Sequence, residues 1–287
     1  MTGTVQAPAG RAGDPLLELR GLTVDLPGPD EELRRVVHGL DLTVAVGERV
    51  ALVGESGSGK SVSAAAVLQL MPEAELGGSV RLNGRELLGM PGKQLRRLRG
   101  AEVGMIFQDP LTALDPVIRV VDQVAEVLIV HGTRKKAAME EARAVLDRLG
   151  VLARLPRGDG YPHELSGGMR QRVGIAMAVV AGPKLLLADE PTTALDVRVQ
   201  EQVLTLLDDL TRERGTAVLL ITHDLGIVAG FSERVAVMRE GALVETADVD
   251  TLFAAPSSDY TAQLLATVPR IDAVLPDQTS DQTGVPQ

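Results

Sequence analysis

The sequence predicts an α/β protein with a parallel-sheet core, an N-terminal antiparallel β subdomain and a helical insert subdomain. Three observations predict this class. Near the N-terminus, apolar residues alternate with polar ones, as in strands with one face in water. Later, continuous apolar runs alternate with amphipathic stretches, which is typical of a parallel sheet covered by helices on both faces. Between these two regions, apolar residues recur with helical spacing.

The alternating region comprises residues 17–26 and 40–46, where leucine or valine occupies alternate positions within each run. Such spacing is typical of antiparallel strands. A continuous apolar run, Val50–Val53, leads directly into a glycine cluster and predicts a buried parallel strand. We expect the next helix to span Ser61–Leu70 and to end near Pro72.

The spacing becomes helical between about residues 110 and 165. Ala138, Ala142, Val145 and Leu149 are four, three and four positions apart, and Gly150 predicts the end of that helix. The later runs that predict strands are Leu185–Ala188, Val218–Ile221 and Val235–Met238. We expect one domain over residues 16–270 with its helical insert at about 110–165, a flexible leader over 1–15 and a flexible tail over 271–287.

Composition excludes several classes of function. The chain has 39 acidic and 29 basic residues and a formal net charge of −10. This balance argues against a nucleic-acid partner, because phosphate backbones call for a basic surface. The chain has no cysteine, which excludes disulfides, zinc–thiolate sites and iron–sulfur clusters. No apolar segment reaches the roughly 18 residues of a membrane-spanning helix, and the leader lacks a secretory signal. We therefore expect a cytoplasmic protein.

A glycine-rich motif directly follows the run Val50–Val53. It comprises Gly54, Glu55, Ser56, Gly57, Ser58, Gly59, Lys60 and Ser61. The motif matches the phosphate-binding P-loop and lies between a predicted strand and helix, as its chemistry requires. Backbone N–H groups would surround a phosphate, Lys60 would reach the β- and γ-oxygens, and the Ser61 hydroxyl would bind Mg²⁺. A glycine-rich turn without this function is the weaker interpretation. The motif predicts a P-loop NTPase with a RecA-like core.

Two carboxylates end the apolar run Leu185–Ala188. At this edge of an α/β sheet, Asp189 is placed to hold Mg²⁺, directly or through water. Glu190, one residue later, is placed to activate the water that attacks the γ-phosphate. Alone, the pair is at least as well explained as an acidic surface turn. Beside a P-loop it predicts a catalytic centre.

A third motif distinguishes among helicases, kinases, GTPases and other NTPases. The segment Leu165–Arg172 reads Leu-Ser-Gly-Gly-Met-Arg-Gln-Arg and resembles the signature of the ABC ATPases. Ser166 is a good helix N-cap, and Gly167 and Gly168 would expose N–H groups as a second anion site. An ordinary capped helix is the alternative for Ser-Gly-Gly alone. The three motifs together favour the ABC family.

The resemblance implies that two chains form each nucleotide site, with the P-loop of one facing the signature of the other. It implies that Gln108 contacts Mg²⁺ and water and relays to membrane subunits, and that Asp196 lies in a loop at the dimer interface. His223 would contact the γ-phosphate. Leu26 takes the place of the aromatic residue on which many members stack adenine, so we expect base recognition to rest on aliphatic surface.

Further segments resemble the dipeptide, oligopeptide and nickel importers of this family: Met105–Pro110, Tyr161–Glu164 and Asp259–Leu265. The last belongs to an extension at about 247–270, where Ser258-Asp259 replaces the usual His-Pro. With Met169 after Gly168, the signature resembles that of the first of two non-identical ATPase subunits. This resemblance implies a non-identical ATPase partner.

The importer resemblance also implies two transmembrane permeases, an extracytoplasmic solute-binding protein acting through them, and a peripheral place on the cytoplasmic face of the membrane. ATP and Mg²⁺ are the implied cofactors. Peptides are the first expectation for the cargo, with nickel chelates, glutathione and sugars left open. The alternatives are a non-transport ABC ATPase of DNA repair or translation, and a nucleotide-binding regulatory subunit that does not hydrolyse.

Overall fold

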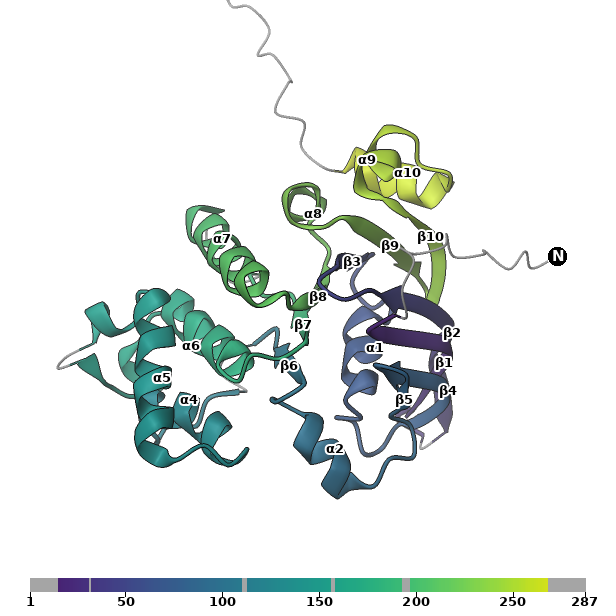
Figure 1. The fold of residues 1–287 in the computed structure, drawn as a ribbon. Helices are drawn as coiled ribbons and strands as arrows, with labels where there is room; N and C mark the ends of the chain where they lie inside the picture. Colours follow the sequence, from purple (N-terminus) through teal and green to yellow (C-terminus); the bar gives the residue numbers. More distant parts are fainter. Residues whose placement is uncertain (1–14, 31, 110–112, 156–157, 193–196, 268–287) are drawn as a thin grey trace, which may run out of the picture.

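The computed structural model describes residues 15–267 except 31, 110–112, 156–157 and 193–196. Two sheets organise these residues (Figure 1). The first has the strand order β2-β1-β4-β5 and the second the order β10-β9-β3-β8-β7-β6. The strands of the first sheet are β1 (Leu17–Pro27), β2 (Leu33–Val44), β4 (Glu75–Leu82) and β5 (Arg85–Glu86). Those of the second are β3 (Arg49–Val53), β6 (Val103–Ile106), β7 (Leu185–Asp189), β8 (Ala217–Thr222), β9 (Arg234–Arg239) and β10 (Ala242–Asp248).

The first sheet is antiparallel, as the alternating pattern predicts. One prediction within it is wrong, because Val46 lies beyond the end of β2 and is 72% exposed. Strands β4 and β5 were not predicted. Gly77 and Gly78 interrupt the apolar pattern of β4, and a Cβ on Gly78 would overlap the carbonyl oxygen of Gly21 on β1. The close approach of β1 and β4 therefore requires glycine at position 78. The same glycine interrupts the apolar alternation from which a strand would be predicted.

The second sheet is parallel from β6 to β9, and β10 joins its edge antiparallel to β9. Its strands form because they are buried on both faces, which explains their continuous apolar runs. The runs predict β3, β7, β8 and β9. Strand β10 was missed because its sequence mixes apolar and polar residues without a run.

Helices cover both faces of the second sheet, as predicted. On one face, α1 (Lys60–Val67) and the antiparallel sheet pack against residues such as Leu52 and Leu187. On the other face pack α6 (Gly167–Val179) and α7 (Val197–Arg214), against residues such as Leu186 and Leu220. The same side carries α8 (Leu225–Phe231), α9 (Val249–Ala254) and α10 (Asp259–Ala266), next to Val53 and Val237. Helices α1 and α6 therefore lie on opposite faces.

The first helix is shorter than predicted, because α1 ends at Val67 and not at Leu70. Gln69 has a left-handed backbone with φ of 48°. The N–H groups of Gln69 and Leu70 turn back to the carbonyls of Ala66 and Ala65, the pattern of a Schellman C-cap. The Arg99 guanidinium also binds the carbonyls of Leu68 and Gln69. The helix ends at this cap, before Pro72 can act.

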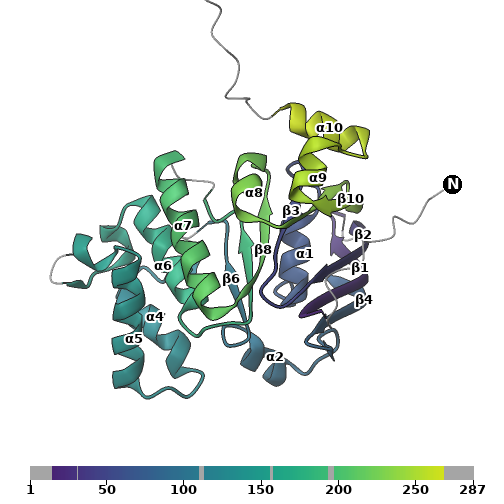
Figure 2. The same cartoon turned by 45° about the horizontal axis from the view of Figure 1, so that its top comes forward.

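Helices α4 (Val120–Ile129) and α5 (Lys135–Arg148) pack beside α6, at the opposite end of the molecule from the antiparallel sheet (Figures 1 and 2). Ala138, Ala142, Val145 and Leu149 are buried on one face, as their spacing predicts. Gly150 follows with φ of 68°, a conformation that suits glycine after a helix. A short helix, α2 (Gly92–Leu98), precedes β6. Over the described residues, no helix combines the length and the apolar character that crossing a membrane requires.

Candidate active site

The P-loop joins β3 to α1, where the sequence predicts it. Gly54, Gly57 and Gly59 have φ values of 153°, 80° and 97°, a region that side chains disfavour. A Cβ on Gly54 would overlap the carbonyl oxygen of Met238 on β9, and one on Gly59 would lie 3.1 Å from the carbonyl oxygen of Val36. Both glycines are thus required by close backbone approach as well as by conformation.

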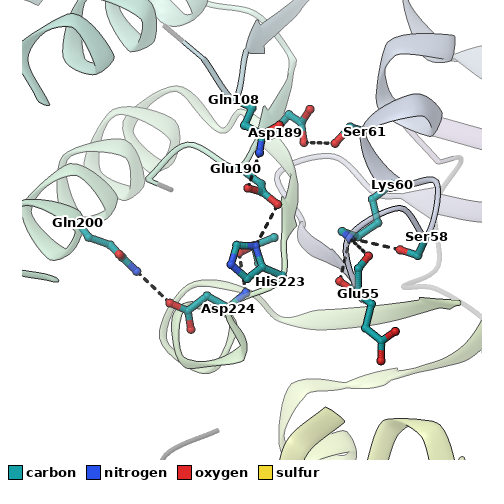
Figure 3. Close-up of polar contacts among 12 residues, drawn as sticks. Glu55, Ser58, Lys60, Ser61, Gln108, Asp189, Glu190, Gln200, His223 and Asp224 are labelled. Carbon is teal, nitrogen blue, oxygen red and sulfur yellow. Dashed lines mark hydrogen bonds and ion pairs between the residues drawn. The ribbon is translucent and has the colours of Figure 1, made fainter. Parts of the chain in front are cut away.

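Lys60 folds back over the loop that precedes it (Figure 3). Its Nζ donates to the carbonyl oxygens of Gly54 and Glu55 at 2.8 and 2.7 Å, and to Ser58 Oγ at 3.2 Å. Burial lowers the pKa of Lys60, although Glu190, Asp189 and Glu55 attract its charge and oppose this shift. The ammonium is held at the centre of the loop, beside the N–H groups that would bind phosphate.

Ser61 and Asp189 meet across the gap between α1 and the end of β7. The Ser61 hydroxyl donates to Asp189 Oδ1 at 2.8 Å (Figure 3). Burial raises the pKa of Asp189; the Ser61 hydrogen bond opposes that rise, and the negative charge of Glu190 adds to it. Among the described residues, no cluster of three or more His, Cys, Asp or Glu could hold a metal ion by itself.

Glu190 is the meeting point of three strand ends. Its Oε2 accepts a hydrogen bond from Gln108 Nε2 at 2.9 Å, and its Oε1 lies 3.0 Å from His223 Nδ1 (Figure 3). Gln108 follows β6, Glu190 follows β7 and His223 follows β8. Glu190 itself has φ of 44°, a strained conformation for a residue with a side chain. The structure thus brings together the three residues to which the sequence assigns catalysis.

The turn that carries His223 is fixed by residues whose part the sequence analysis missed. Asp224 caps α8 by accepting from Gly226 N at 2.8 Å, and its other oxygen accepts from Gln200 Nε2 of α7 at 3.1 Å. Its own N–H donates to Thr222 Oγ1. An aspartate just before a helix is a readable N-cap signal. The bond from Gln200 has no such signal in the sequence.

The signature lies at the start of α6, on the opposite face of the sheet from α1. Ser166 is the N-cap, and its Oγ accepts from Met169 N at 3.4 Å. Ser166, Gly167 and Gly168 line an open cavity of about 860 Å³ together with Arg154. One chain therefore presents its P-loop and its signature as two separate surfaces. Asp196 lies outside the described residues.

Gln171 is a further residue that the sequence analysis did not single out. Its buried Nε2 donates to the carbonyl oxygen of Pro191 at 2.7 Å. Pro191 directly follows Glu190, so this bond ties α6, which begins at the signature, to the turn after β7. A glutamine on an otherwise apolar helix face is the only signal in the sequence that points to it.

Leu26 lies near the end of β1, paired with Arg34 on β2, and is partly buried against the core. Closer to the P-loop along the same two strands, Val24 of β1 pairs with Val37 of β2. A Cβ on Gly59 would lie 3.5 Å from Val37 Cγ2. Val36 and Val37 of β2 thus lie directly beside the P-loop. The contact of Leu26 with a nucleotide base stays a prediction.

The geometry can be compared with known proteins. Residues 37–193 match the family described as ABC transporter. The chain is 47% identical over 270 residues to the oligopeptide transport ATP-binding protein OppD of Salmonella typhimurium, covering 93% of this chain and 80% of that protein. It is 43% identical to the protein of the same name from Bacillus subtilis, covering 94% and 76%.

A solved structure also resembles the fold over most of the chain. It is a dimeric ATP-binding cassette in a post-hydrolysis state, bound to ADP and Pi, with a TM-score of 0.71 and 28% identity. The match covers 81% of this chain and 98% of the other.

Proposed function

This chain belongs to the ABC transporter ATP-binding proteins, which hydrolyse ATP to energise transport, and we propose that it drives oligopeptide import through partner permeases. The observation that carries the proposal is the convergence of Gln108, Glu190 and His223 opposite Lys60 and Ser61. A phosphate-binding loop facing a carboxylate held by two further polar side chains is an arrangement suited to attack of water on a bound triphosphate.

The P-loop supplies the binding half of this chemistry. Its glycines allow the loop backbone to wrap around a phosphate, and Lys60 would exchange the carbonyls of Gly54 and Glu55 for phosphate oxygens. Ser61 and Asp189 offer hard oxygen ligands that fit Mg²⁺, which when bound would neutralise charge on the phosphates. The Nε2 of Gln108 is used by Glu190, which leaves its amide oxygen for the same cation.

Glu190 is the proposed general base. Both carboxylate oxygens have a neighbour, since Gln108 donates to one and His223 Nδ1 lies beside the other. A carboxylate fixed in this way can orient a water molecule and accept its proton while the water attacks the γ-phosphate. The position of His223 at the adjacent strand end suits a contact with the γ-phosphate as the site fills.

The separation of P-loop and signature supports a dimeric working form. Helices α1 and α6 pack on opposite faces of the sheet, so the anion site at Ser166 does not face the P-loop of its own chain. A second ATPase subunit would complete each site, and the solved cassette that this fold resembles is dimeric. The methionine at position 169 favours a non-identical partner.

Exposed apolar side chains support docking to membrane subunits. Phe107, Val117, Ile129 and Val130 are exposed, and Phe107 and Val127 line an apolar cleft of about 310 Å³ beside Gln108. We assign this cleft to a permease segment, which would place the chain on the cytoplasmic face of the membrane. A permease segment bound there would lie beside Gln108, whose side chain is hydrogen-bonded to Glu190.

Peptide cargo is supported by the relatives, whose names describe oligopeptide transport. An extracytoplasmic solute-binding protein would deliver the peptide to the permeases. The alternative of a non-transport ATPase acting on nucleic acid is disfavoured by the net charge of −10.

The test is ATP-driven uptake of a labelled oligopeptide by vesicles that contain the assembled transporter. Lys60→Ala should abolish uptake, because it removes the cation that binds the phosphates. Lys93→Ala changes an exposed lysine on α2 and should leave uptake at the wild-type level. Equal uptake by both variants would contradict an ATP-dependent role for this chain. ATP hydrolysis without peptide uptake would contradict the cargo and leave the ATPase role intact.

A further inference from the structure

The C-terminal hairpin of α9 and α10 reaches the P-loop. Both views place α9 and α10 together beside the β9–β10 edge of the sheet (Figures 1 and 2). Tyr260, in the first turn of α10, is buried at 7% exposure. Its hydroxyl oxygen accepts a hydrogen bond from the backbone N–H of Glu55 at 3.2 Å. A residue 205 positions further along the chain therefore holds a P-loop peptide unit.

We propose that Tyr260 is a positioning residue of the nucleotide site, through which the C-terminal hairpin fixes the conformation of the P-loop. This inference rests on the ATP-binding role proposed above. Glu55 directly follows Gly54, where an added Cβ would overlap the Met238 carbonyl of β9, so this part of the loop packs closely against that strand. Tyr260 holds the N–H side of Glu55 from outside the loop.

The effect of Tyr260 should be greatest when nucleotide binds. Lys60 Nζ holds the carbonyl of Glu55 at 2.7 Å, and phosphate binding would draw the ammonium away from that carbonyl. The Tyr260 hydroxyl does not depend on Lys60, so it would retain Glu55 while the lysine moves. A loop that keeps its shape binds phosphate without an ordering cost.

Two contacts hold the tyrosine itself. The Arg239 guanidinium lies over the Tyr260 ring, 4.9 Å from the centroid, and the backbone N–H of Tyr260 donates to Ser258 Oγ at 3.2 Å. The residues just before it are fixed by buried Glu245 of β10, which accepts from the N–H groups of Ser257 and Ser258 at 2.7 and 3.1 Å. These contacts do not use the Tyr260 hydroxyl, so replacing tyrosine by phenylalanine should remove the bond to Glu55 and leave the hairpin packed.

The experiment compares Tyr260→Phe with Tyr161→Phe in the full-length chain. Tyr161 is the other tyrosine of the sequence; it too has an arginine over its ring, Arg119 at 5.0 Å, but it lies before the signature, far along the chain from the P-loop. The readouts are equilibrium binding of a fluorescent ATP analogue with Mg²⁺, and the thermal midpoint of the nucleotide-free protein. In the assembled transporter, KM for ATP and kcat are measured separately.

We expect Tyr260→Phe to weaken analogue binding and to raise KM about three- to tenfold, the size of one lost hydrogen bond. The kcat should stay close to wild type, the nucleotide-free midpoint should fall by only about 2–4 °C, and Tyr161→Phe should match wild type throughout. Affinity within twofold of wild type, or an equal loss in Tyr161→Phe, would overturn the inference. A lowered midpoint with unchanged affinity would also overturn it, since the hydroxyl would then serve stability alone. Failure of the wild-type chain to bind the analogue better than Lys60→Ala would instead contradict the ATP-binding role.

Discussion

Glu190 has an unusual backbone conformation that a hydrogen bond to the neighbouring strand accompanies. Its backbone has φ of 44° and its N–H donates to the carbonyl of Ile221 on the neighbouring strand. The chain therefore turns sharply at the end of β7 and directs the carboxylate toward Gln108 and His223. Strained backbone of this kind persists where surrounding contacts over-determine it. The turn explains how Asp189 and Glu190, adjacent in sequence, can have different neighbours.

Glu190→Gln should retain nucleotide affinity and lower ATP turnover by about 10²-fold or more, because an amide cannot accept the proton of the attacking water. Steady-state ATPase of the assembled transporter and equilibrium binding measure the two quantities. Glu213→Gln, which changes an exposed carboxylate paired with Arg148, is the matched control. Turnover of Glu190→Gln within about threefold of wild type would remove Glu190 from this role.

The ionised carboxylate of Asp189 lowers the stability of the nucleotide-free fold, and the proposed cation site explains its presence. Burial raises its pKa above the ordinary value of 3.8, so ionisation destabilises the nucleotide-free fold. The penalty develops as the pH rises from the unfolded pKa through the raised folded pKa, and it is complete above the latter. A buried carboxylate of this kind is suited to a site that a cation later fills.

Asp189→Asn should therefore raise the thermal midpoint of the nucleotide-free chain at neutral pH by about 2 °C or more. The gain should shrink as the pH falls through the raised pKa, since both side chains are then neutral. Thermal unfolding over a pH series measures it, and Mg²⁺-dependent nucleotide binding should be lost in the same variant. A gain that is independent of pH would show that charge is not its cause.

At the scale of elements, α6 and β6 pack closely against each other. A Cβ on Gly104 of β6 would overlap the carbonyl oxygen of Ala178 on α6. Because the φ of Gly104 is not in the left-handed region, the requirement for glycine is steric alone. The helix and strand therefore meet backbone to backbone near the C-terminal end of α6.

Gly104→Ala should destabilise the fold by about 1–3 kcal/mol, because the added methyl must push α6 from the sheet. Gly174→Ala is the matched control in α6 itself, where nothing lies within 4 Å of an added Cβ. There the same change should stabilise by about 0.5–1 kcal/mol through helix propensity. Denaturant unfolding of the two variants measures both, and a neutral Gly104→Ala would contradict the packing argument.

At the scale of the whole molecule, the fold holds the P-loop and the signature apart. The P-loop lies at the start of α1 and the signature at the start of α6, on opposite faces of one sheet. Gln171 links the signature helix to the residue that follows Glu190. A nucleotide bound between two chains would therefore act on both catalytic strands of the pair.

Ser166→Arg tests this arrangement. In the isolated chain it should leave ATP affinity nearly unchanged, because Lys60 and the P-loop amides are intact. In the assembled transporter it should block hydrolysis at the site shared with the partner, because a bulky cation replaces a small N-cap at an interface. Loss of affinity in the isolated chain would place Ser166 in its own nucleotide pocket, and undiminished ATPase in the complex would place it in none.

Much of this molecule could be read from the sequence. Strands β3, β7, β8 and β9 are continuous apolar runs, so burial on both faces is visible in the residues themselves. The P-loop, the Asp189-Glu190 pair and the Ser166 cap are local motifs, each formed by neighbours in the chain. Strands β4 and β10 were missed because glycines or mixed polarity disguise their pattern.

What the sequence by itself determined is the class of fold and the chemistry that each motif can supply, because both depend on residue type at short spacing. Tertiary structure decided which of these groups meet. The bonds from Tyr260 to the P-loop, from Gln171 to Pro191 and from Gln108 to Glu190 join residues 205, 20 and 82 positions apart. Such contacts follow from strand order and helix packing, which are set by the burial of the whole core and not by any local segment.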